Sequence, residues 1–159
     1  MPREDDIARN RFATYAGRRN FRAPRFLGSG KDGVVHEAES NDFPGFVAVK
    51  SFYRREQFLR ERDAYIRLQE ERILQVRGHN VPQLIAHDDE LMAIEMTVVM
   101  IPYILDFADA WVDKEPEFSD EVWADWNQKL EDDFGERAHD VRRMLAVLRN
   151  HGVILLDVH

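Results

Sequence analysis

The chain has 159 residues, of which 44% are hydrophobic and 33% charged, a balance typical of a globular domain with a hydrophobic core. It contains no cysteine, which excludes disulfides and thiolate metal sites and favours a cytoplasmic location. No apolar run reaches the length of a membrane span, so we expect no membrane partner. Residues 1–80 carry 16 Lys/Arg and 12 Asp/Glu, whereas residues 81–159 carry 6 and 18. This distribution argues against nucleic acid as the partner, because a binding groove needs a sustained cationic surface.

The first part of the chain predicts an arm followed by a sheet. Residues 1–23 are polar and arginine-rich, and we expect a solvated N-terminal extension containing a short helix. Strands are predicted on both sides of the glycine-rich segment 28–33, and a third at 46–52. A helix is predicted over 54–76, where helix formers dominate without Gly or Pro. Two further strands are predicted at 82–89 and 91–99.

The second part of the chain predicts helices. Ser119 is a suitable N-cap for a helix running to about residue 133 and breaking near Gly135. A second helix is expected over 136–150, because its apolar residues recur at helical spacing, and an extended segment follows it. The sequence therefore predicts an α+β fold: a five-stranded antiparallel sheet with one inserted helix over 24–105, then helices over 106–159.

The segment GSGKDGVV has glycines at 28, 30 and 33, a pattern that several nucleotide-binding folds share. In a dinucleotide-binding fold this loop opens a helix, but here Val34 and Val35 begin a strand. A Walker A loop needs Gly-Lys-Ser/Thr at its end, which is also missing. The remaining interpretation is a β-hairpin that covers phosphates, with Val35 positioned over an adenine ring.

Such a hairpin requires a cation, and Lys50 at the end of VAVK is the candidate. By strand periodicity Lys50 shares a face with Ala48. Glu61 shares a helix face with apolar residues, and a carboxylate there is costly unless a cation pairs with it. We therefore expect a Lys50–Glu61 ion pair. The alternatives are that Lys50 is a solvated surface charge and that Glu61 pairs at the surface with Arg54 or Arg62.

Together these segments resemble the protein-kinase-like fold over residues 24–105. GSGKDGVV matches its glycine loop, VAVK its third-strand lysine motif, and FLRERDAYIRL its C-helix. The resemblance implies a phosphotransferase that uses ATP and Mg²⁺, with Lys50 on the phosphates and Glu61 as its partner. It also implies nucleotide contacts at Gly28, Ser29, Gly30, Gly33, Val35, Ala48 and Lys50. The backbone of the strand that leads to the hinge would hydrogen-bond adenine around Glu95, Met96 and Val98.

The same resemblance makes Asp157 the candidate base that orients an acceptor hydroxyl. Leu155 and Leu156 stand where ordinary protein kinases have His-Arg, a departure similar to divergent or atypical kinases. The asparagine and the Asp-Phe-Gly motif that bind magnesium in the family do not occur after Asp157, so we assign no metal ligand and expect a fragment of a longer protein. The phosphate acceptor, a protein or a small molecule, is not specified. Asp157 as a simple turn residue is the alternative.

Two other functions are alternatives to the kinase-like interpretation. A catalytically inactive, pseudokinase-like binding or regulatory module would explain the missing metal ligands and the aromatic-acidic stretch 107–126. Retention of Lys50, Glu61 and the glycine loop argues against a purely structural role. A histidine-based metal-dependent hydrolase is weakly supported, because the six histidines form no i, i+4 pair.

Overall fold

The computed structural model describes residues 1–98, 105–106 and 110–158. Its centre is a five-stranded sheet in the order β1-β2-β3-β7-β6, antiparallel throughout. The strands are β1 (Arg22–Ser29), β2 (Gly33–Glu39), β3 (Phe46–Phe52), β6 (Leu84–Asp88) and β7 (Ala93–Thr97). Helix α2 (Arg55–Glu70) is inserted after the third strand. The predicted α+β class, with five antiparallel strands and one inserted helix, is confirmed; Val99, the last residue of the predicted fifth strand, lies outside the described residues.

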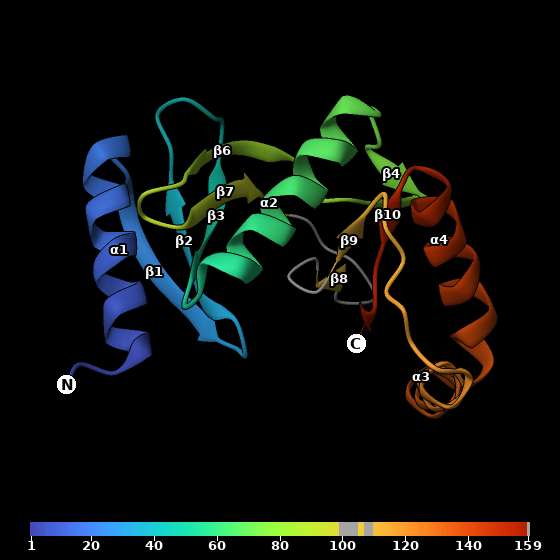
Figure 1. Cartoon of the computed structure of the whole chain (residues 1–159). Helices are drawn as coiled ribbons and strands as arrows, with labels where there is room; N and C mark the ends of the chain where they lie inside the picture. The colour runs from blue at the N-terminus through green and yellow to red at the C-terminus, as the bar shows by residue number, and fades with distance from the viewer. Residues whose placement is uncertain (99–104, 107–109, 159) are drawn as a thin grey trace.

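The N-terminal segment differs from the solvated arm that the sequence predicts. Helix α1 (Glu4–Arg19) packs against the sheet, and its buried residues Ala8, Phe12 and Tyr15 form one apolar stripe. This stripe contacts the sheet face that carries Val49 and Ala93, while α2 lies on the opposite side (Figure 1). The arginines between the apolar positions hide a short amphipathic pattern, which is why composition alone suggested an arm.

Helix α2 also ends earlier than predicted, at Glu70 instead of residue 76. The backbone N–H of Ile73 donates to Leu68 O at 2.9 Å, and that of Arg72 to Gln69 O at 3.1 Å. These two bonds form a Schellman motif, in which Arg72 takes the left-handed conformation with φ of 55°. No glycine marks this end, so the sequence contained no stop signal there. The short strands β4 (Gln75–Val76) and β5 (His79–Asn80) follow.

The C-terminal part agrees with the prediction. The Ser119 hydroxyl accepts a hydrogen bond from the Val122 N–H and caps α3 (Asp120–Phe134). A single 3₁₀ turn, η1 (Gly135–Arg137), leads into α4 (Ala138–Asn150). The extended segment after α4 forms β10 (Val153–Ile154) and β11 (Asp157–Val158), which pair with β9 (Trp111–Val112) and β8 (Leu105–Asp106) respectively.

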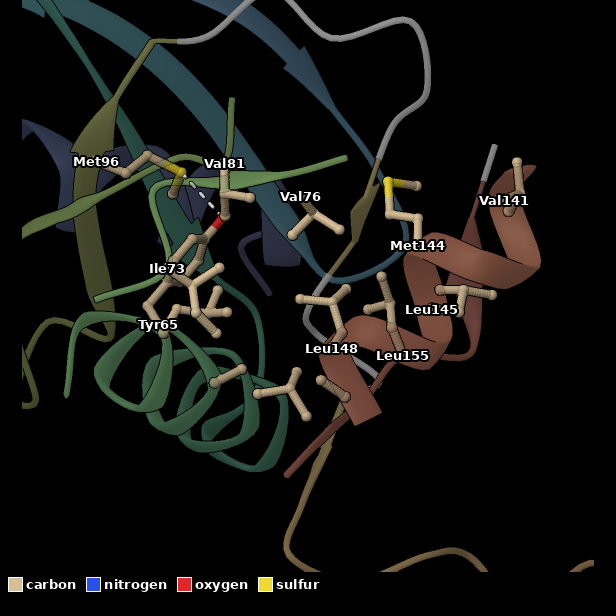
Figure 2. Close-up of a cluster of buried hydrophobic side chains, with 14 of the residues drawn as sticks. Tyr65, Ile73, Val76, Val81, Met96, Val141, Met144, Leu145, Leu148 and Leu155 are labelled. Atoms are coloured by element: carbon tan, nitrogen blue, oxygen red, sulfur yellow. Dashed lines mark hydrogen bonds between the residues drawn. The ribbon is translucent and has the colours of Figure 1, made fainter. Parts of the chain in front are cut away.

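One hydrophobic core joins the sheet region to the C-terminal helices. Figure 2 shows Tyr65 and Ile73 near α2 and, on the side of α4, Met144 and Leu148, with Val76 between the two groups. All these residues belong to one cluster of buried side chains. The C-terminal helices therefore share one continuous apolar core with α2. Within the described ranges, no helix has both the length and the apolar character needed to cross a bilayer.

Candidate functional site

A cavity of about 550 Å³ lies between the glycine-rich turn, strand β3 and the end of β7. A cavity of this size suits a small-molecule ligand. Most predicted site residues line it, namely Gly28, Ser29, Gly30, Gly33, Val35, Ala48, Lys50, Glu61, Met96 and Val98. The topology thus brings residues from β1, β2, β3, α2 and β7 to one concave surface.

The glycine-rich turn between β1 and β2 is anchored on the end of β3. The Gly30 N–H donates to Gly33 O at 2.9 Å, and the Tyr53 N–H donates to Asp32 O at the same distance. A Cβ atom on Gly33 would lie 2.3 Å from the backbone oxygen of Ser51, so only glycine permits this approach. At Gly28 and Gly30, by contrast, an added Cβ would meet no atom within 4 Å, and neither residue has a positive φ. Protein packing therefore requires glycine at 33 but not at 28 or 30.

The predicted ion pair between Lys50 and Glu61 is present. The Lys50 Nζ lies 2.8 Å from Glu61 Oε2, and the two side chains are 13% and 4% exposed. The surface alternatives do not occur, because Arg54 pairs with Glu4 and Arg62 pairs with Asp63 and Asp89. The Lys50 ammonium and the Glu61 carboxylate thus pair at the cavity wall, and the Lys50 side chain is the more exposed of the two.

The rest of the cavity wall is largely apolar. Ala48 of β3 pairs in register with Met96 of β7, and Val35 of β2 pairs with Lys50. The Tyr65 hydroxyl lies 3.4 Å from the Met96 sulfur, which holds that side chain against α2 (Figure 2). Val98 is 49% exposed. A flat apolar group could lie against this wall with its polar end towards Lys50.

Glu95 does not join the other predicted site residues. Its side chain is fully buried on the opposite face of the sheet, and its backbone is paired with Val49 and Ala86 on both sides. The Glu95 carboxylate accepts hydrogen bonds from the Tyr15 hydroxyl at 2.7 Å and from Arg19 Nε at 2.9 Å. Burial and this hydrogen bond raise the pKa of the Tyr15 phenol above its usual value. Glu95 therefore joins helix α1 to β7.

Asp157 lies in β11, which pairs with β8. Leu156, the residue before Asp157, is held by helix α3. The Trp126 indole N–H of that helix donates a hydrogen bond to Leu156 O at 2.8 Å. Leu155 is buried in the core shared with α4. The side chain of Asp157 is outside the described part of the structure, so its predicted role as a base stays a prediction.

Several lining residues were missed by sequence reasoning. Lys31 and Asp32 occupy the unspecified positions of the glycine pattern, and Tyr65, Pro82 and Thr97 complete the wall. Tyr65 lies one helical turn after Glu61, on the same face of α2, and this spacing was the available signal. Among the residues that the structure describes, no three His, Asp or Glu side chains are grouped to hold a metal ion.

No model of a protein family matches the chain, and no curated protein matches it.

Proposed function

We propose that the cavity binds ATP and that the protein is kinase-like, a phosphotransferase in its complete form. The observation that carries the proposal is the buried Lys50–Glu61 pair in the wall of a cavity lined by the glycine-rich turn. A buried ion pair is a poor source of stability, because desolvating both charges offsets their attraction. Its position at a cavity wall instead suits a lysine that is oriented to meet an anionic ligand.

The glycine pattern supports the same proposal. Gly28 and Gly30 line the cavity, although neither backbone conformation nor packing requires glycine there. Bare backbone at these positions allows a phosphate to approach the turn and accept hydrogen bonds from its N–H groups.

Different residues would then contact different parts of the nucleotide. Lys50 and the turn bind the phosphates, and Val35, Ala48 and Met96 contact the base. Asp157 orients the acceptor hydroxyl. Magnesium would neutralise charge on the phosphates, but the described residues do not assemble a site for it, and we assign no step to a metal.

The proposal predicts saturable binding of Mg-ATP that Gly30→Val weakens by about tenfold or more, because the new side chain occupies the phosphate space. The fold tolerates a side chain at residue 30, so the melting temperature should stay close to that of the wild type. Isothermal titration calorimetry measures the affinity. Lys50→Ala should weaken binding strongly as well, and Lys129→Ala on the exposed face of α3 is the control. The proposal fails if the wild type shows no binding at millimolar ATP, or if Gly30→Val binds as tightly as the wild type.

The alternative is a nucleotide-binding regulatory module without transfer activity. It requires only the cavity with its glycine-rich turn and Lys50. An assay for ATP hydrolysis and autophosphorylation separates the two: turnover that Lys50→Ala abolishes supports the enzyme, and binding without turnover supports the module.

A further inference from the structure

We propose that Lys31 is a second phosphate-binding cation and that it makes the site prefer nucleoside triphosphates to monophosphates. This inference rests on the proposed function, because it assigns part of the same ligand. Lys31 lines the cavity that Lys50 also lines, but it comes from the tip of the glycine-rich turn and is exposed.

The turn holds Lys31 at a defined place relative to Lys50. The Gly30–Gly33 hydrogen bond closes the turn directly around residues 31 and 32. The Tyr53 N–H donates a hydrogen bond to Asp32 O, and Gly33 lies close against the backbone of Ser51 in β3. Lys50 lies on β3, so the turn that carries Lys31 is attached to the strand that carries Lys50.

The charges in the cavity wall indicate separate tasks for the two lysines. Among the described residues, the charged side chains that line it are Lys31, Asp32, Lys50 and Glu61. Lys50 is already matched by Glu61 at 2.8 Å and is 13% exposed, which suits an inner phosphate. Asp32 is 6% exposed, so the turn presents Lys31 as its exposed charge.

A phosphate chain that starts at Lys50 and runs outward along the turn meets Lys31 with its terminal groups. A triphosphate carries about two more negative charges than a monophosphate, and those charges lie at the outer end. A lysine suits this position, because its compact charge sits on a flexible stem that follows a mobile phosphate. The site therefore binds ATP by two cations and AMP by one.

The test compares the dissociation constants of ATP, ADP and AMP for the wild type and for Lys31→Gln, by calorimetry at fixed salt. We expect Lys31→Gln to weaken ATP by about fivefold, the upper range for an exposed ion pair, and AMP by less than about twofold. Lys31→Glu should weaken ATP further. The ATP effect should shrink as ionic strength rises, because the contact is exposed. Lys129→Gln removes the same charge far from the turn and should leave all three constants unchanged.

Two results would overturn the inference on Lys31 alone: equal weakening of ATP and AMP, or no change in either, in a wild type that binds ATP. A wild type that binds none of the three nucleotides overturns the proposed function, and this inference with it. Melting temperatures of the variants report on folding, which this exposed turn residue should not affect.

Discussion

At the scale of single residues, the environment of His36 shows how a side chain outside the cavity responds to pH. His36 lies on β2 and is 7% exposed. Its ring stacks on Phe12 of α1 with centroids 3.8 Å apart, and Phe26 of β1 meets it edge-on. The Arg9 guanidinium lies over the Phe26 ring. Burial, and secondly the charge of Arg9, lower the pKa of His36 below its usual value.

This lowered pKa predicts a loss of stability in acid. Below about pH 6.5 the unfolded chain binds a proton on His36 that the folded protein resists, so the free energy of unfolding falls as the pH falls. His36→Phe keeps an aromatic ring between Phe12 and Phe26 and should flatten this pH dependence, measured by urea denaturation from about pH 7.5 to about pH 5. His139→Gln, at an exposed position, should keep the wild-type dependence. An unchanged slope in His36→Phe would contradict the prediction.

At the scale of elements, helix α1 is attached to the sheet by two adjacent arginines in different settings. Arg19 is 26% exposed and binds the fully buried Glu95 carboxylate, which Tyr15 also contacts. Arg18 binds Asp88 and Glu90 at the surface. Because Glu95 is the neighbour of Met96 in β7, the network ties α1 to the strand that forms one cavity wall.

Replacing each arginine in turn should show how much the buried Glu95 partner and the exposed partners contribute to the free energy of unfolding. Arg19→Ala leaves the Glu95 carboxylate buried with only Tyr15 as partner, and we expect a loss of about 3 kcal/mol in the free energy of unfolding. Arg18→Ala should have little effect, because exposed ion pairs are screened by water and salt. Chemical denaturation of both variants measures the difference. Similar losses of stability in Arg19→Ala and Arg18→Ala would show that the burial of Glu95 does not strengthen its ion pair with Arg19.

At the scale of the whole molecule, Arg67 links α2 to the C-terminal strands. Its guanidinium binds the Asp113 carboxylate through both terminal nitrogens and also donates to His151 O. Arg67 lowers the pKa of Asp113 by this contact. Gly152 lies against the pair with φ of 81°, and a Cβ there would be 2.4 Å from both an Arg67 nitrogen and an Asp113 oxygen. The helix that carries Glu61 is thus joined to the segment that leads to Asp157.

Two glycine substitutions test this link. Gly78 has the same φ as Gly152, but a Cβ on Gly78 would meet nothing within 4 Å. Gly78→Ala should therefore cost only the backbone strain, about 1 kcal/mol. Gly152→Ala adds displacement of the Arg67–Asp113 pair and should lower the free energy of unfolding more. Equal losses in the free energy of unfolding would mean that the Arg67–Asp113 pair can move aside without destabilising the fold. Thermal and urea unfolding of both variants provide the comparison.

Local patterns in the sequence were sufficient for much of the fold. The alternation in FVAVKSF predicted β3, and the Ser119 cap predicted the start of α3. The Lys50–Glu61 pair was predictable because helix periodicity placed Glu61 on an apolar face, where a carboxylate needs a cation, and Lys50 was the candidate on the preceding strand. The end of α2 was not, because Arg72 adopts a conformation that usually marks glycine.

The sequence by itself determined the five strands of the sheet, the inserted helix, the two C-terminal helices and the inward position of Glu61, because these depend on residues only a few positions apart. Tertiary structure alone decided that α1 packs on the sheet, that Glu95 turns away from the cavity, and that Lys31 lines it. Tyr15 and Glu95 are 80 positions apart, and no local period relates them. Burial of an ion or an apolar stripe depends on such distant partners, which only the folded chain brings together.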